Sequence, residues 1–290
     1  MDNTIRLPDG RQLSFAEYGD SQGKPVFFFH GTPSSRLLRH PNDAITKSLG
    51  IRLITIDRPG FGLSDPLPKR QLLDWPEDVA ALADALDIDR FAVAGISGGG
   101  LYVLACAYKL PQRVAKAGSI SGVGPTDFDE NFRDMYPERK LAISLARLAP
   151  WLLKPLIGLT HNPQRNIEKY FQGIVKKSSK SDQEILNRPE MKSLMKKNWL
   201  EGTHQGVGGF VREGIIMSHP WGFRLEEIQI PVHIWHGDAD TSTPQVMAQY
   251  IAGKIPDCQL TVFPGEGHFL LFDHWAEILT TLVSDEGSNQ

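Results

Sequence analysis

The chain has 290 residues, 41% of them hydrophobic and 22% charged, as expected for a water-soluble globular protein of one or two domains. Its 31 basic and 34 acidic residues nearly cancel, so we expect neither nucleic-acid binding nor stable membrane association, which both need clustered Lys and Arg. The two cysteines, Cys106 and Cys258, make no disulfide framework, and the first residues lack the pattern of a secretory leader. A cytoplasmic location is therefore expected.

The amino-terminal segments 4–7 and 11–18 have the composition of paired strands. They flank Pro8-Asp9-Gly10, and Asp-Gly between two extended segments is a strong signal for a β-hairpin. Further along, short apolar runs alternate with helix-length segments. The predicted strands are 25–29, 51–56, 91–94, 114–120, 232–235 and 259–263, and the predicted helices are 74–86, 98–110, 244–252 and 274–283. This alternation predicts a doubly wound α/β fold with a mostly parallel sheet.

One long stretch interrupts the alternation. Residues 123–220 contain no convincing strand and have a helical, loop-rich composition. We therefore predict a core of residues 1–122 and 221–290, with a helical cap of residues 123–220 inserted after the sixth strand. Leu141, Leu145, Leu148 and Leu152 recur at helical spacing, which predicts packing of the cap onto the core. The alternatives for this segment are the roof of a hydrophobic pocket and a contact with a membrane surface.

The most informative motif is Gly95-Ile-Ser97-Gly98-Gly99, a G-x-S-x-G pattern between a predicted strand and a predicted helix. Such a sharp turn lifts the serine hydroxyl clear of the sheet, and glycines are needed where a side chain would strike neighbouring backbone. The alternative interpretation, a phosphate-binding loop, does not fit, because the spacing matches neither G-x-G-x-x-G nor G-x-x-x-x-G-K-[ST]. Ser97 is therefore a candidate nucleophile.

A serine nucleophile needs a base, and the base needs a carboxylate that orients it. Asp240 and His268 each follow the end of a predicted strand, the edge at which doubly wound sheets build their sites. Asp238 is a rival to Asp240, although its position also suits a turn cap, and Asp127 is a further candidate acid. The chain order Ser, Asp, His is the order found in hydrolases of this strand–turn–helix type.

The segment Phe29-His30-Gly31-Thr32-Pro33 also follows a predicted strand. Acyl transfer creates an oxyanion, and fixed backbone N–H groups stabilise that charge. We predict that Thr32 and Gly98 donate these N–H groups, with His30 in a structural role. His233 and His236 point to opposite faces of one strand, so a metal pair built from them is not expected.

Five segments together resemble the α/β-hydrolase fold family of serine hydrolases. They are His30-Gly31-Thr32-Pro33, Asp57-Arg58-Pro59-Gly60-Phe61-Gly62-Leu63-Ser64, Gly95-Ile96-Ser97-Gly98-Gly99, His236-Gly237-Asp238-Ala239-Asp240 and Gly267-His268. The resemblance implies an eight-stranded sheet with an antiparallel second strand. It also implies that the segment 57–64 shapes the floor of the site.

The same resemblance implies hydrolysis of a small-molecule ester or amide, with no metal and no organic cofactor, by a monomer or homodimer. Haloalkane dehalogenases and epoxide hydrolases carry aspartate where this chain has Ser97, so their chemistries are not expected. The H-G-G-P-G segment of proline iminopeptidases is replaced here by His30-Gly-Thr-Pro-Ser34, which weakens that assignment. A lyase, a cofactor-free perhydrolase and a non-catalytic signalling module on the same fold remain open as alternatives.

Overall fold

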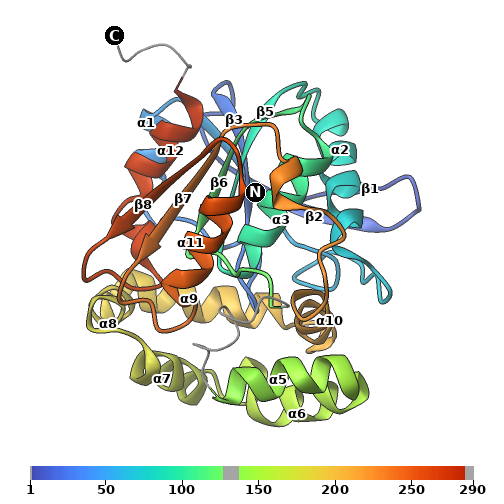
Figure 1. Cartoon of the computed structure of the whole chain (residues 1–290), viewed down its shortest axis with the longest axis vertical. Coiled ribbons are helices and arrows are strands. Elements are labelled where there is room, and N and C mark those ends of the chain that lie inside the picture. The colour runs from blue at the N-terminus through green and yellow to red at the C-terminus, as the bar shows by residue number, and fades with distance from the viewer. Residues whose placement is uncertain (1, 127–136, 285–290) are drawn as a thin grey trace.

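The computed structural model describes residues 2–126 and 137–284 (Figure 1). Its centre is one eight-stranded sheet with the strand order β1-β2-β4-β3-β5-β6-β7-β8. The strands are β1 (Asp2–Arg6), β2 (Gln12–Gly19), β3 (Lys24–Phe29), β4 (Ile51–Ile56), β5 (Phe91–Ile96), β6 (Val114–Ile120), β7 (Val232–Gly237) and β8 (Cys258–Phe263). All eight strands were predicted, and the predicted α/β-hydrolase fold is confirmed.

The amino-terminal hairpin also forms as the sequence predicts. Strand β2 pairs antiparallel with both β1 and β4, while β3 to β8 run parallel to one another. At the tip, Gly10 has φ 88°, a conformation that glycine adopts without a steric penalty. The antiparallel second strand follows directly from this tight turn, because a short connection reverses the chain beside its neighbour.

Helices cover both faces of the sheet. On one face lie α2 (Trp75–Ala85), α3 (Gly98–Lys109) and α11 (Gln245–Lys254), and on the other lie α1 (Asp43–Ser48) and α12 (Trp275–Val283). Strand β3 shows why its sequence is continuously apolar: Phe29 packs on Trp75 at 5.3 Å between ring centroids, and Phe28 packs on Trp275 at 5.5 Å on the opposite face. Helix α1 was not predicted, because six residues are too few to show a helical period.

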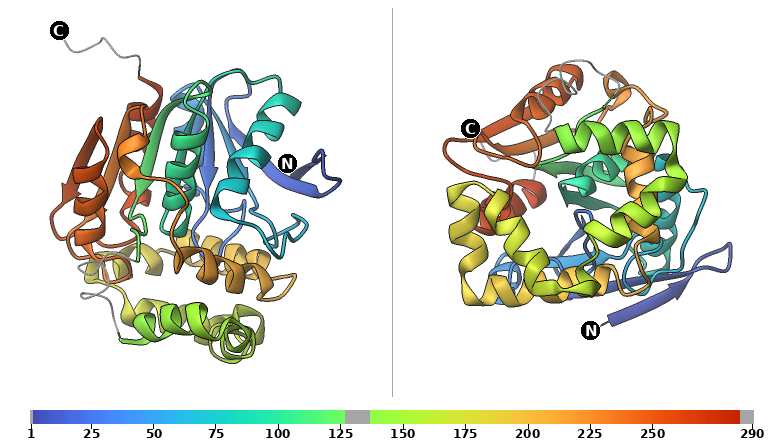
Figure 2. Two further views of the ribbon diagram at one scale, coloured as in Figure 1. Left: turned by 45° about the vertical axis from the view of Figure 1, so that its right-hand side comes forward. Right: turned by 90° about the horizontal axis from the view of Figure 1, so that it is seen from below.

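Between β6 and β7, the described residues form helices and no strand. The α-helices are α5 (Pro137–Leu148), α6 (Leu153–Thr160), α7 (Ile167–Lys177), α8 (Lys180–Asn187), α9 (Pro189–Gly202) and α10 (Gly208–Met217). We call them the helical insertion. Figure 2 shows these helices as a separate layer beyond one end of the sheet, with α5 and α6 on the outside. That end is where β5 and β6 lead into their following loops.

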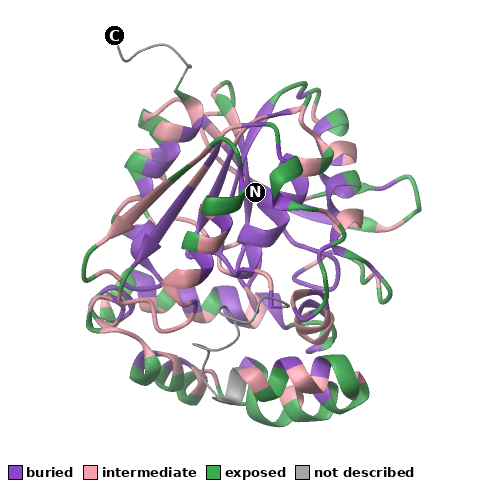
Figure 3. Ribbon diagram, in the orientation of Figure 1, coloured by how far each residue is buried: buried purple, intermediate pink, exposed green. Residues whose placement is uncertain are grey.

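The predicted packing of Leu141, Leu148 and Leu152 against the core is wrong. These side chains are 59%, 79% and 46% exposed (Figure 3). The prediction assumed one continuous helix, but α5 ends at Leu148 and the chain turns at Pro150, a residue that lacks the N–H needed to continue a helix. Helix α5 buries Ile143 and Ala146 instead, so its leucines face outward.

Candidate active site

Ser97 lies in the sharp turn that joins β5 to α3. Its backbone has φ 56° and ψ −122°, a strained conformation for a residue with a side chain. The Ser97 N–H donates to Ile120 O at 2.9 Å, and Ser97 O accepts from Val123 N–H at 3.2 Å. These two hydrogen bonds to the end of β6 and the residues after it hold the turn in place, and Ser97 O also accepts from Gly100 N–H of α3 at 3.0 Å.

The glycines beside Ser97 are required by close backbone contacts. A Cβ on Gly95 would come within 2.8 Å of the carbonyl group of Gly99, and a Cβ on Gly99 would overlap the carbonyl oxygen of Phe29. The predicted reason for the G-x-S-x-G pattern, collision of side chains with neighbouring backbone, is confirmed.

Asp240 and His268 form a hydrogen bond in the structure. His268 Nδ1 lies 2.8 Å from Asp240 Oδ2, and both side chains are buried, at 9% and 0% exposure. With Nδ1 facing a carboxylate, the ring proton belongs on Nδ1, and Nε2 is left as an acceptor. Burial alone would raise the pKa of Asp240, but the charge and hydrogen bond of His268 outweigh it and hold that pKa well below its usual range.

Thr243 and His236 complete the surroundings of Asp240; His236 belongs to a segment noted in the sequence, whereas no sequence motif marks Thr243. Asp240 Oδ1 accepts from the N–H groups of Ser242 and Thr243 at 2.6 and 2.9 Å, and the Thr243 hydroxyl lies 2.7 Å from Oδ2. His236 Nε2 lies 2.9 Å from Thr243 O, so this nitrogen carries a proton. Burial lowers the pKa of His236, which keeps the ring neutral beside the carboxylate.

Thr243 also links this pair to the turn that holds Ser97. Its hydroxyl oxygen lies 3.1 Å from Ser121 O, one residue beyond the carbonyl that accepts the Ser97 N–H. Ser97 follows β5, Asp240 follows β7 and His268 follows β8, so the carboxyl ends of these parallel strands bring the three residues to the same edge of the sheet, as the topology predicts.

The alternatives to Asp240 in the sequence were Asp238 and Asp127. Asp238 Oδ1 accepts from Gly265 N–H at 2.6 Å, so it caps the turn after β8, the role that the sequence offered as its alternative. Asp127 lies outside the described residues.

The segments of Thr32 and Gly98 lie in contact. A Cβ on Gly98 would approach Thr32 Oγ1 to 2.7 Å. Among the residues that the structure describes, neither the Thr32 nor the Gly98 N–H has a hydrogen-bond partner. Gly98 is the first residue of α3, so its N–H group lies at the positive end of that helix. Two adjacent, unpaired N–H groups beside Ser97 are the arrangement that an oxyanion requires.

A buried ion cluster from the helical insertion supports the Thr32 segment. Glu213 of α10 is fully buried, and it contacts Arg58 at 3.2 Å, Tyr102 at 2.8 Å and Thr32 Oγ1 at 3.2 Å, as well as Arg70. Burial alone would raise the pKa of Glu213, but the two guanidinium groups lower it to about 2. The carboxylate is therefore charged at neutral pH.

Arg58 carries this support to the backbone of the Thr32 segment. Its guanidinium donates to His30 O, and to Gly31 O at 3.1 Å and Thr32 Oγ1 at 3.0 Å. The His30 ring is buried beneath the segment, as predicted, and burial together with the nearby Arg58 holds its pKa well below the usual range. Glu213 was not predicted, because a single glutamate in a helical segment carries no signal of its partners.

A second residue of the helical insertion holds the backbone at His268. Asp182 of α8 is fully buried, and its two carboxylate oxygens accept from His268 N–H at 3.0 Å and Phe269 N–H at 2.7 Å. Gly267 is needed here, because a Cβ at that position would overlap the Asp182 carboxylate. The Gly267-His268 pair was noticed in the sequence, but its partner in the insertion was not.

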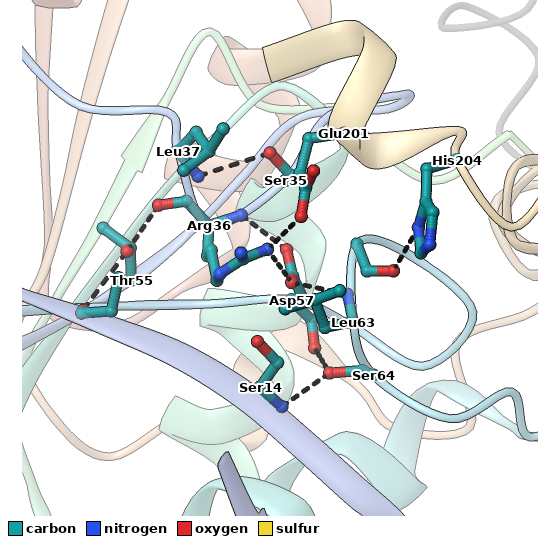
Figure 4. A network of polar contacts seen from close by, with 12 residues as sticks. Ser14, Ser35, Arg36, Leu37, Thr55, Asp57, Leu63, Ser64, Glu201 and His204 are labelled. Carbon is teal, nitrogen blue, oxygen red and sulfur yellow. Dashed lines mark hydrogen bonds and ion pairs between the residues drawn. The ribbon is translucent and has the colours of Figure 1, made fainter. Parts of the chain in front are cut away.

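The segment 57–64 is held by a network around Asp57 (Figure 4). Asp57 is fully buried and accepts from Arg36 N–H at 2.6 Å, from the Arg36 guanidinium at 2.8 Å and from Leu63 N–H at 3.0 Å. Glu201 of α9 lies 2.6 Å from the same guanidinium, and Ser64 donates to Asp57 O at 2.7 Å. These bonds fix the shape of the segment 57–64, from which Arg58 reaches Glu213. The polar residues of this segment therefore position Arg58.

A cavity of about 800 Å³ opens between the segment that follows β3 and helix α9. Arg39, Lys197 and Glu201 contribute to its wall. None of its lining residues is Ser97, Asp240 or His268, so it is separate from the candidate active site. Within residues 2–126 and 137–284, no cluster of three or more His, Cys, Asp or Glu side chains is arranged to hold a metal ion.

The parallel sheet, the strained serine turn and the bonded Asp–His pair define a hydrolase-type α/β enzyme scaffold. Residues 24–274 match the family model of the alpha/beta hydrolase fold. The chain therefore belongs to the α/β hydrolase fold family.

Curated relatives and solved structures agree with this assignment. The chain is 28% identical over 282 residues to a non-heme chloroperoxidase of Streptomyces lividans, covering 93% of this chain and 94% of the relative. It is 24% identical over 274 residues to a pimeloyl-[acyl-carrier protein] methyl ester esterase of Legionella pneumophila, covering 93% and 96%. The fold is similar to that of a bromoperoxidase from Bacillus anthracis, with a TM-score of 0.74, 21% identity and coverage of 98% and 100%.

Proposed function

We propose that this chain is a serine hydrolase that cleaves a small carboxylic ester or amide through an acyl-enzyme on Ser97. The observation that carries the proposal is the 2.8 Å hydrogen bond between His268 Nδ1 and Asp240 Oδ2, at the sheet edge where the strained turn presents Ser97. The esterase relative from Legionella pneumophila supports an ester as the substrate class.

In this mechanism His268 Nε2 accepts the proton of Ser97 as the serine oxygen attacks the substrate carbonyl carbon. The same imidazole then donates the proton to the leaving group, and it later activates water to release the acyl group. Asp240 holds the tautomer with the proton on Nδ1 and stabilises the imidazolium that forms. The N–H groups of Thr32 and Gly98 stabilise the oxyanion. Side chains and backbone fill every role, so the proposal includes no metal and no organic cofactor.

The helical insertion acts in this proposal as the cap, residues 123–220, and covers the site. Asp182 and Glu213 support the proposal because they tie two of its helices to the segments that carry His268 and Thr32. Cap helices that share bonds with the reacting centre are well placed to select a substrate by its size and shape.

Covalent labelling tests the nucleophile. Folded protein should take up one fluorophosphonate probe per chain, and Ser97→Ala should abolish both labelling and hydrolysis of short acyl esters, with a loss of several orders of magnitude in rate. Ser48→Ala, on the outer helix α1, is the matched control and should label like the unmodified protein. Full esterase activity in Ser97→Ala would refute the assignment. Absence of labelling in folded protein would favour the non-catalytic alternative.

A second candidate activity is perhydrolysis, in which hydrogen peroxide rather than water attacks the acyl-enzyme. The chloroperoxidase relative, aligned over 93% of this chain, is the observation that favours it. Peracid formation from an acyl ester and peroxide should then exceed the uncatalysed rate and disappear in Ser97→Ala. Product analysis also separates the lyase alternative, because a hydroxynitrile lyase releases cyanide without a covalent acyl group.

A further inference from the structure

The exposed large hydrophobic side chains of residues 2–126 and 137–284 all lie in one short stretch of the helical insertion. They are Leu141 (59% exposed), Leu148 (79%), Trp151 (70%), Leu152 (46%), Leu156 (40%) and Leu159 (67%). We call these six side chains the α5–α6 face. Figure 2 places α5 and α6 in the layer farthest from the sheet, and Figure 3 shows them largely exposed. Contiguous exposed apolar groups on a folded chain mark an interaction surface.

The spacing of these residues gives each helix an outward apolar stripe. Leu141 and Leu148 are seven residues apart on α5, and Leu152, Leu156 and Leu159 follow the i, i+4, i+7 pattern at the start of α6 and along it. The opposite side of α5 is buried through Ile143 and Ala146, and on α6 the buried residue is Leu153, about a quarter turn from the stripe. The face is thus a property of both helices and is not a set of isolated leucines.

The two helices are arranged to lie along a surface. No single helix in the described part of the chain is long and apolar enough to cross a membrane. Only the bent pair Lys140–Leu148 and Pro150–Arg165 reaches the required length and composition together, and the chain bends by 119° between its two parts. A bent pair of short helices with one apolar side matches the geometry of helices that lie in the plane of a membrane interface.

Basic residues dominate the charge of α5 and α6, in which Glu138 is the one acidic residue. Residues 140–165 contain Lys140, Arg147, Lys154 and Arg165 and no Asp or Glu. Lys154 and Arg165 are exposed, whereas the guanidinium of Arg147 donates to Ser218 O at 2.5 Å and to Thr126 Oγ1 at 3.2 Å. Apolar side chains interleaved with cations are the combination that binds anionic lipid, because the cations meet headgroups while the apolar groups enter the acyl boundary.

We propose that the α5–α6 face binds reversibly to the surface of an anionic lipid bilayer. This peripheral contact differs from the stable association that the overall charge argues against. The net charge of −3 is spread over the whole chain, and interactions beyond about 8 Å are largely screened at physiological ionic strength, so the local cations dominate at contact. A second copy fits the face less well, because twofold pairing would bring the same cations together with Glu138 as the one carboxylate in the sequences of α5 and α6.

Trp151 adds to the argument and supplies a probe. Tryptophan favours the membrane–water interface, because its ring is apolar and its N–H is polar. Of the six tryptophans, Trp151 is 70% exposed and the other five are at most 6% exposed. Quenching by aqueous acrylamide therefore reports on Trp151 almost alone.

The test measures binding to vesicles of phosphatidylcholine alone and of phosphatidylcholine mixed with phosphatidylglycerol, by co-sedimentation and by protection of Trp151 from acrylamide. We expect binding and protection with the anionic vesicles only, and weakening as salt is added. Trp151→Phe should still sediment but should lose the fluorescence change. The assay uses no substrate, so its result is independent of the proposed hydrolase activity.

Variants locate the contact. Leu148→Ser and Leu159→Ser should each weaken vesicle binding about tenfold, because each removes one large apolar group from the face. Lys154→Glu should also weaken binding, whereas Lys109→Glu, the same charge change at the exposed end of α3, should have little effect. Thermal melting checks that each variant is folded.

Three results would overturn the proposal. They are no binding to anionic vesicles, equal losses in Lys154→Glu and Lys109→Glu, and a self-association that Leu148→Ser abolishes while vesicle binding is unaffected. The last result would assign the face to a second copy of the chain.

Discussion

Replacing Glu213 by glutamine tests whether the buried ion cluster holds the candidate site together. The carboxylate is fully buried between Arg58 and Arg70, which are 0% and 2% exposed. Glutamine keeps the shape but removes the negative charge, so two buried guanidinium groups lose their shared counter-charge. Breaking a buried pair in this way costs about 3–5 kcal/mol, which lowers the melting temperature by about 10 °C in a chain of this size.

The pH dependence gives an independent estimate of the same interaction. The pKa of Glu213 is about 2 in the folded chain, against an ordinary value of 4.5. A lowered folded pKa contributes stability that is complete above the unfolded pKa and is lost as pH falls toward the folded value. The stability difference between the unmodified chain and Glu213→Gln should therefore be about 3 kcal/mol at neutral pH and should shrink between pH 4.5 and pH 2.

Urea unfolding at several pH values measures this difference. Glu201→Gln is the matched control, because Glu201 also lies in the helical insertion and pairs with an arginine of the core, but it is 25% exposed and its partner Arg36 keeps Asp57. The control should lose about 1 kcal/mol or less. If Glu213→Gln were no less stable than Glu201→Gln, or if its deficit did not depend on pH, the reasoning would be refuted.

Three further outcomes follow from the site and its surroundings. Asp240→Asn should lower kcat by about 10⁴-fold, because an amide favours the wrong tautomer of His268; ester hydrolysis with a short acyl ester measures it, and a loss below tenfold would contradict the role. Asp182→Asn should lower the free energy of unfolding by about 2 kcal/mol, because the asparagine NH₂ group cannot accept from one of the two N–H groups that the Asp182 carboxylate binds. If urea unfolding showed the variant to be as stable as the unmodified chain, these two hydrogen bonds would not have the stabilising role assigned to them. Gly214→Ala should raise the free energy of unfolding by up to about 1 kcal/mol, because nothing lies within 4 Å of the new methyl group inside α10. Gly99→Ala should be strongly destabilising, because its methyl group would overlap a backbone carbonyl; similar melting temperatures for the two glycine variants would disprove the packing argument.

The sheet was predictable from sequence because its signals are local. Buried parallel strands are continuously apolar, as in β3, and Asp9-Gly10 marks a hairpin within three residues. The spacing around Ser97 was equally informative, because Gly95 and Gly99 lie where a Cβ atom would overlap neighbouring backbone atoms. Asp240 and His268 could be proposed because both follow the ends of apolar strands.

The contacts between the helical insertion and the site could not be predicted, because they join distant parts of the chain. Glu213 meets Arg58 across 155 positions, and Asp182 meets His268 across 86. No periodicity or short motif records such pairs. The outward face of α5 was mispredicted for a related reason: helical spacing gives the period of an apolar stripe, but neither the point at which Pro150 interrupts the helix nor the direction in which the stripe points.

The bonds of Asp182 and Glu213 have a consequence for engineering. Each lies on a different helix of the insertion, and each ends on a separate backbone segment of the reacting edge. A chimera that exchanged these helices for those of a relative would remove both carboxylates. Grafts that keep α8 and α10 and exchange only α5 and α6 should preserve turnover, and they give library construction a natural crossover point.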